Sequence, residues 1–82
     1  MTESVLNQVR RIAADIFNMP LDQVTAESSP DTVETWDSLQ HLNLVVALEQ
    51  NFRLAFAPEE IEEMLSINLV VALVQEKLRL TP

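Results

Sequence analysis

Hydrophobic residues recur at helical spacing through the first part of the chain. These residues are Val5, Val9, Ile12 and Ile16. Charged residues occupy the opposite side, so the pattern predicts an amphipathic helix over about residues 3–18, capped by Thr2 or Ser4. Asn18 is expected to end this helix in the left-handed conformation, because the chain contains no glycine for that purpose. Pro20 then prevents the helix from continuing.

Residues 19–36 follow without a regular period and are rich in proline, serine, threonine and acidic residues. A connection of this length inside a small domain usually carries anchors of its own or has a function. We expect Leu21, Val24 and Val33 to be those anchors, because they are isolated apolar residues in a polar segment. Trp36, at the end of the segment, is expected to be partly buried.

Residues 37–52 are predicted to form a second helix that is apolar almost all round. Such a helix is either central in a bundle or presents one side to a partner. Leu39 and Val46 are seven residues apart and therefore share a face, with Gln40 and Asn43 beside them. The residues expected in the core are Leu42, Val45, Leu48 and Phe52.

Two further helices complete the predicted fold. Pro58 suits the first turn of a short helix over about 58–64, and Ser66 is expected to cap a last helix over about 67–80. Their apolar residues are Ile61, Met64 and Leu65 in the short helix, and Ile67, Val70, Val71, Val74 and Leu78 in the last. The sequence therefore predicts an all-α fold, a small four-helix bundle with three longer helices, one short helix and a long first loop. Residues 1–82 are expected to form a single domain.

The hexapeptide Asn-Leu-Val-Val-Ala-Leu occurs twice, at 43–48 and at 68–73. Two copies do not make a repeat protein, which needs about three or more stacked units. We interpret the two copies as similar packing solutions in two different helices, and we assign no function to them.

Composition narrows the possible functions. The lack of glycine argues against a phosphate-binding glycine loop, and the lack of cysteine excludes disulfides, thiol catalysis and cysteine-based zinc sites. The longest apolar run, Leu69 to Val74, is six residues long and cannot span a membrane. We expect a cytoplasmic monomer without membrane insertion.

The charge of the chain is strongly negative. The net charge is −8, and between Asp15 and Glu63 there are eleven acidic residues and one basic residue. Such a surface repels nucleic acid and should attract basic patches on protein partners. Repulsion among these acids is also expected to raise their pKa values in the folded state, so that stability falls as pH rises through them.

Asp37 and Ser38 lie where the irregular segment gives way to a helix. Asp37 is expected to be the N-cap, because its carboxylate can accept a hydrogen bond from the free N–H groups of the first turn. Ser38 is then the first helical residue, where unpaired N–H groups and the positive end of the helix dipole favour a phosphate ester. Aspartate and serine also cap many helices without further function, so Asp37-Ser38-Leu39 is by itself a weak indication.

Other chemistries fit these residues less well. Asp37, Ser38 and His41 are too close together on one helix to align as a hydrolase triad, so we expect His41 to be exposed rather than catalytic. A calcium loop beginning at Asp31 has apolar residues at two ligand positions, and no metal site is expected. The alternative from another class is a non-carrier acidic helical interaction module, which would dock a basic partner without modification of Ser38.

Over nearly its whole length the chain resembles the acyl carrier protein family. The matching positions are Val24, Asp37-Ser38-Leu39, Ala47-Leu48-Glu49, Phe52 and Phe56-Ala57-Pro58-Glu59-Glu60. The resemblance implies that Ser38 receives 4′-phosphopantetheine from coenzyme A, with Asp37 and Leu39 beside it. The thiol of that arm would carry acyl groups as thioesters, and the protein itself would not be an enzyme.

The resemblance also implies partners. They would be a phosphopantetheinyl transferase and enzymes that load or transfer acyl groups through basic docking patches. The expected docking residues are Leu39, Gln40, Asn43, Val46, Glu59 and Glu60. Two departures from carriers of fatty acid synthesis are the segment Glu34-Thr35-Trp36 before the motif and the uncharged amides of the second helix. A role in fatty acid, polyketide or specialised lipid synthesis is expected, with an aminoacyl or peptidyl carrier as the alternative.

Overall fold

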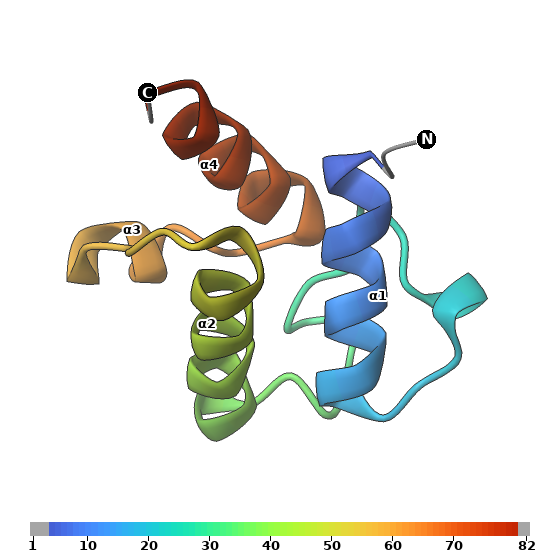
Figure 1. Cartoon of the computed structure of the whole chain (residues 1–82). Coiled ribbons are helices and arrows are strands. Elements are labelled where there is room, and N and C mark those ends of the chain that lie inside the picture. The colour runs from blue at the N-terminus through green and yellow to red at the C-terminus, as the bar shows by residue number, and fades with distance from the viewer. Residues whose placement is uncertain (1–3, 81–82) are drawn as a thin grey trace.

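The helices follow one another in the predicted order. In a computed structural model, which describes residues 4–80, they are α1 (Val5–Phe17), the 3₁₀ turn η1 (Leu21–Gln23), α2 (Ser38–Phe52), α3 (Pro58–Glu62) and α4 (Ile67–Leu80) (Figure 1). The described part of the chain contains no strand. The all-α fold with three longer helices, one short helix and a long first loop is therefore confirmed. Thr2 and the predicted helix start at residue 3 lie outside the described residues.

The helix ends show how this chain folds without glycine. The Ser4 side chain accepts a hydrogen bond from the Asn7 N–H at 3.2 Å and caps α1. Asn18, immediately after α1, has φ 54°, which confirms the predicted left-handed terminator. Arg53 performs the same task after α2 with φ 56°, although a side chain with a Cβ makes this conformation unfavourable.

The bundle is assembled around α1. This helix packs against both α2 and α4, and α3 lies on the side of α2 and α4 that faces away from α1 (Figure 1). Aliphatic side chains dominate the core, as the composition requires. The largest fully buried side chains belong to Phe17, Leu44, Leu48, Met64, Ile67, Val9, Val24, Val70 and Val74.

The long first loop is fixed by backbone hydrogen bonds to the last helix. The N–H groups of Ile67 and Asn68, in the first turn of α4, donate to the carbonyls of Ser28 and Ala26 at 2.9 and 2.8 Å. Ser66 adds its side chain, which accepts from the Leu69 N–H at 3.2 Å and confirms the predicted cap. Backbone N–H groups that have no acceptor within the first turn of α4 are thus paired with carbonyls of the loop. These hydrogen bonds join residues that are far apart in the sequence.

Two of the three predicted loop anchors are correct. Val24 and Val33 are buried, whereas Leu21 is 45% exposed and the prediction that it enters the core is wrong. The physical reason lies in Arg10, whose guanidinium donates to the carbonyls of Leu21 at 3.1 Å and Val24 at 2.6 Å. These bonds hold η1 against α1 through its backbone, so the Leu21 side chain is left facing outward.

Two other burial predictions need correction. Trp36 was expected to be partly buried but is only 4% exposed and belongs to the core. Leu42, expected to face the core, is 55% exposed. Leu65, expected among the apolar residues of the short helix, lies beyond the end of α3 and is 61% exposed. The core side of α2 is already filled by Leu44 and its neighbours, and Leu42 and Leu65 instead line a surface groove described below.

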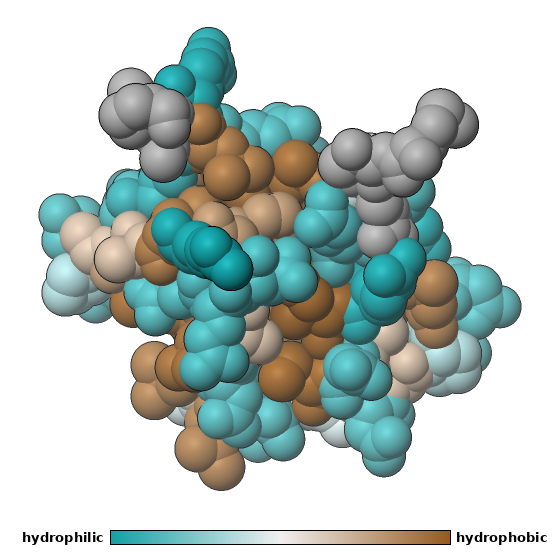
Figure 2. Space-filling view, viewed as in Figure 1, coloured by the Kyte–Doolittle hydropathy of each residue, from teal (hydrophilic) through white to brown (hydrophobic). Residues whose placement is uncertain are grey.

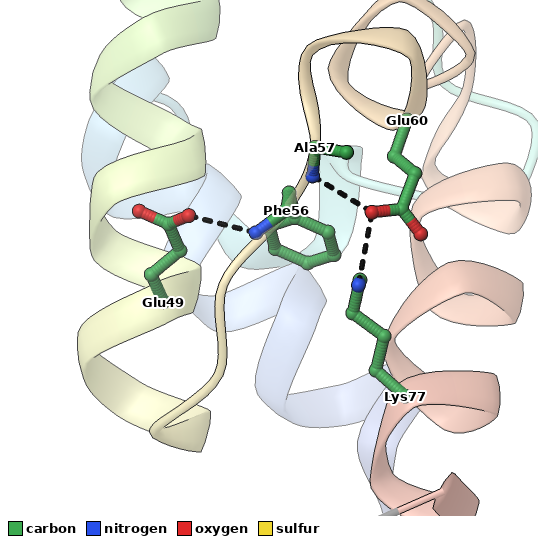
Figure 3. A network of polar contacts seen from close by, with 5 residues as sticks. All are labelled: Glu49, Phe56, Ala57, Glu60 and Lys77. Atoms are coloured by element: carbon green, nitrogen blue, oxygen red, sulfur yellow. Dashed lines mark hydrogen bonds and ion pairs between the residues drawn. The ribbon is translucent and has the colours of Figure 1, made fainter.

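A polar network joins α2, the following loop, α3 and α4 (Figure 3). The Glu49 carboxylate accepts from the Phe56 N–H at 2.9 Å, and the Glu60 carboxylate accepts from the Ala57 N–H at 2.7 Å. Lys77 of α4 forms an ion pair with Glu60 at 2.9 Å and lies 5.7 Å from the Phe56 ring centroid. The short helix α3 is therefore held at its first turn by charges from two sides.

Candidate functional site

The start of α2 has the predicted cap. Asp37 has extended backbone angles, and its carboxylate accepts from the Gln40 N–H at 2.8 Å. Its carbonyl accepts from the His41 N–H, also at 2.8 Å. Asp37 thus fixes where the helix begins, and this makes Ser38 the first helical residue.

Ser38 is exposed, so its hydroxyl is accessible to an enzyme and to a bulky substituent. The N–H groups of Ser38 and Leu39 lie in the first turn, where an α-helix supplies no backbone acceptor for them. The dipole of this 15-residue helix adds partial positive charge at the same place. A negatively charged ester on Ser38 is therefore electrostatically favourable.

His41 is half-buried and bridges two elements, so the prediction that it is simply exposed is wrong. The Trp36 indole N–H donates to Nδ1 of His41 at 2.9 Å, and Nε2 of His41 lies 2.9 Å from the carbonyl oxygen of Ile61 in α3. An indole nitrogen can only donate, so Nδ1 must be the acceptor and Nε2 must carry the proton. Because both ring nitrogens are engaged, neither is available to take a proton from Ser38. His41 is consequently not a catalytic base, as the sequence also indicated.

A groove opens beside Ser38, between the start of α2 and the end of α3. It has a volume of about 510 Å³ and is lined by Pro30, Trp36, Asp37, Ser38, His41, Leu42, Met64 and Leu65. Asp37 and Ser38 were predicted from the sequence, whereas Leu42 was predicted to lie in the core and Leu65 only on the apolar side of the short helix. The sequence offers one usable signal for the other lining residues, since Trp36 and His41 lie only five residues apart on either side of the helix start. The groove thus places the exposed Ser38 beside an apolar rim.

The predicted partner face of α2 is exposed. Leu39 is 66% exposed and Val46 is 50% exposed, which excludes the alternative that they are ordinary core residues. The amide of Asn43 donates to the side-chain oxygen of Gln40 at 3.0 Å, so the two amides form a pair on the surface. Figure 2 shows hydrophobic side chains protruding next to the lower, N-terminal end of α2. This end of the helix is a mixed apolar and amide surface adjoining Ser38.

The acidic residues of α3 differ in how accessible their charge is. Glu59 is exposed, whereas Glu60 is bound to the Ala57 N–H and to Lys77. The Ala57 hydrogen bond and then the Lys77 ammonium lower the pKa of Glu60 from its ordinary value. Glu60 therefore offers a partner less free charge than Glu59, Glu62 or Glu63, which are all exposed.

Two negative findings apply to residues 4–80. No three histidine or acidic side chains in this range gather closely enough to hold a metal ion. None of the helices in the same range has the length and apolar character needed to cross a bilayer.

The sequence has relatives that match it over most of their length. No family model matches the chain. It is 34% identical over 73 residues to the acyl carrier protein of Akkermansia muciniphila. The matched segment covers 89% of this chain and 91% of that protein. It is 28% identical over 78 residues to the acyl carrier protein of Petrotoga mobilis, covering 95% and 92% of the two chains.

The fold gives the same result. The solution structure of the holo acyl carrier protein from Geobacter metallireducens superimposes with a TM-score of 0.82 at 31% identity, covering 92% of this chain and 86% of that one. Agreement of sequence and fold over nearly full-length relatives shows that this chain belongs to the acyl carrier protein family and is a carrier rather than an enzyme.

Proposed function

We propose that Ser38 carries a 4′-phosphopantetheine arm, joined to its Oγ through a phosphodiester, and that acyl groups travel on the thiol of this arm. The observation that supports the proposal most strongly is the exposed serine at the first position of a capped helix in an acyl carrier fold. When the arm is attached to Ser38, its thiol forms the thioester with the acyl group. Coenzyme A is its expected source.

The residues around Ser38 fit such a group. The free N–H groups of the first turn of α2 stabilise the phosphodiester charge, and Asp37 keeps them in place by fixing the helix start. Leu39 is exposed next to Ser38 and is available to an enzyme that approaches the hydroxyl. The groove lined by Leu42 and Leu65 offers apolar surface to an acyl group held on the arm.

We further propose that Leu39 and Val46 are the apolar anchors of a docking face, with Gln40 and Asn43 between them. Their exposure next to Ser38 supports this role. Buried apolar anchors govern how long a complex lasts, whereas charges at its edge govern how fast it forms. Glu59 and Glu60 would meet the basic patches of a phosphopantetheinyl transferase and of acyl-loading and acyl-transfer enzymes, Glu59 more strongly because Glu60 is already paired. The acyl intermediates would belong to fatty acid, polyketide or specialised lipid synthesis.

Modification of the purified chain by a phosphopantetheinyl transferase with coenzyme A tests the carrier proposal. Intact mass and peptide mapping should show one added phosphopantetheine, on Ser38. Ser38→Ala should remain folded and unmodified. Ser66→Ala is the matched control, because Ser66 is another serine at the start of a helix, and this variant should be modified like the wild type. Labelling of Ser38→Ala, or none of the wild type, would refute the proposal.

A further inference from the structure

The inner end of the groove beside Ser38 is closed by a hydrogen-bonded bridge. Trp36 donates to His41, and His41 in turn reaches the Ile61 carbonyl, both over 2.9 Å. The bridge therefore runs from the segment before α2, through α2, to α3. Trp36 and His41 both line the groove, as does Met64, which is fully buried.

Behind this bridge lies the hydrophobic core, to which both Trp36 and Phe17 belong. The Trp36 ring stacks on Phe17 of α1 with a centroid separation of 4.9 Å, and on the His41 ring at 6.1 Å. No buried side-chain nitrogen or oxygen in the described part of the chain lacks a hydrogen-bond partner. An acyl chain entering deeper between α2 and α3 would have to part His41 from Ile61. The Nε2–H of His41 would then lose its acceptor in a half-buried position, which is unfavourable.

The outer part of the groove is, by contrast, open. Leu42 and Leu65 stand at its rim with more than half of their side chains exposed, and Ser38 lies in the same lining. An apolar group tethered to Ser38 can cover these two side chains without breaking any hydrogen bond. The groove thus has a favourable shallow position and an unfavourable deep one.

We infer that the Trp36–His41–Ile61 bridge sets the depth of the groove and so determines which cargo is sheltered. Acyl groups short enough to lie against Leu42 and Leu65 are protected, and the additional methylene groups of longer chains stay in solvent. His41 acts here as a positioning residue and not as a catalytic one. The inference depends on the proposed loading of Ser38.

The bridge itself can be tested without any cargo. The chain has one tryptophan and one histidine, so each gives a single set of signals in nuclear magnetic resonance. Nitrogen shifts of the His41 ring should show Nε2 protonated and Nδ1 unprotonated at neutral pH. The Trp36 indole N–H should exchange slowly in the wild type and faster in His41→Ala. A ring protonated on Nδ1 would overturn the bridge, and this result is independent of Ser38 modification.

Selection by depth is tested on protein loaded with butanoyl, octanoyl or dodecanoyl phosphopantetheine by transferase, with loading verified by intact mass. The readout is the rate at which hydroxylamine cleaves the thioester. In the wild type, octanoyl and dodecanoyl groups should be cleaved at the same rate. In His41→Ala the dodecanoyl group should be cleaved more slowly than in the wild type, by about fourfold or more. A factor of about four is the change in an equilibrium that burying one further methylene group produces. Failure to load refutes the proposed function, whereas loading without this difference refutes only the inference.

Two variants distinguish the bridge from simple packing. His41→Gln can accept from Trp36 and donate to Ile61 through its amide, so its cleavage rates should match those of the wild type. Trp36→Phe keeps a ring against Phe17 but removes the donor, and it replaces His41→Ala as the test if that variant does not fold. Dodecanoyl protection in the wild type equal to that in His41→Ala, or in Trp36→Phe where it replaces that variant, would overturn the inference, and so would His41→Gln behaving like His41→Ala.

Discussion

Glu60 shows how a single residue can depart from the behaviour of a strongly acidic chain. Mutual repulsion was expected to raise the pKa values of the acids, but for Glu60 this prediction is wrong. The Ala57 N–H, followed by the Lys77 ammonium, lowers the pKa of its carboxyl from 4.5. A carboxyl with a lowered pKa in the folded state contributes stability above its unfolded pKa, and this contribution is lost as pH falls through the folded pKa.

Glu60→Gln should remove that acid-dependent part of the stability. The wild type should be more stable than the variant near neutral pH, and the difference should disappear as the pH falls below 4.5 and through the lowered pKa of Glu60. Thermal melts recorded across this range measure the effect. Glu59→Gln serves as the matched control, because Glu59 is the exposed neighbour on the same helix turn. Parallel curves for the wild type and Glu60→Gln would show that the interactions of Glu60 do not stabilise the fold.

Arg53 offers a second test at the residue scale. Its φ of 56° is unfavourable for any residue with a Cβ and natural for glycine, which the chain lacks. Arg53→Gly should therefore raise the free energy of unfolding by about 0.5–1 kcal/mol after the greater freedom of glycine in the unfolded state is subtracted. Urea unfolding measures this change. Asn18→Gly should gain less, since asparagine tolerates the left-handed conformation better. A loss of stability in Arg53→Gly would show that its side chain contributes more than its backbone strain removes.

The elements themselves could be predicted from sequence much better than the faces they bury. The repeated hexapeptide shows why. In α2 the first leucine of the hexapeptide, Leu44, is buried and the second valine, Val46, is exposed. In α4 the equivalent Leu69 is exposed and Val71 is buried. The buried face has turned by one residue, about 100° around the helix, although the six residues are identical. Tertiary neighbours decide this rotation, and a local pattern does not contain them.

The same limit applies to the candidate site. Asp37 and Ser38 could be located because a helix cap depends only on adjacent residues. The Trp36–His41 bond and its continuation to Ile61 depend on where α3 packs, 20 residues further along the chain. Leu42 was misplaced because α2 is apolar around most of its circumference, so the sequence could not show which side faces a groove.

The partner face of α2 allows a prediction that separates docking from folding. Leu39→Ala and Val46→Ala should each keep the free energy of unfolding within about 0.5 kcal/mol of the wild-type value, since both side chains are largely exposed. Each should also speed dissociation from a phosphopantetheinyl transferase, at a loss of about 1–2 kcal/mol in binding. Surface plasmon resonance beside thermal melts measures both effects. Leu48→Ala, a fully buried position on the same helix, should instead destabilise the fold by about 2–5 kcal/mol. Unchanged dissociation in both surface variants would refute the docking role.

At the scale of the whole molecule, charge is distributed unevenly. The net charge is −8, and some of the few positive groups serve the fold instead of neutralising surface acids. Arg10 donates to the backbone carbonyls of Leu21 and Val24, and Lys77 is paired with Glu60 inside the polar network of Figure 3. The exposed Glu59 and Glu62 of α3 and Glu63 directly after it lie on one short segment of the chain. Repulsion of this kind destabilises a compact state and is weakened by salt.

The melting temperature should consequently rise with ionic strength. Raising it from about 0.01 M to about 0.15 M shortens the screening length from about 30 Å to about 8 Å, which removes repulsion between separated acids. Each 1 kcal/mol so relieved should add about 4–8 °C in a domain of this size. Sodium and potassium chloride should act equally if screening is the cause. The triple variant Glu59→Gln, Glu62→Gln, Glu63→Gln should melt higher at low salt and respond less to added salt. A melting temperature independent of salt in the wild type would show that the acids are too far apart in the fold to repel one another.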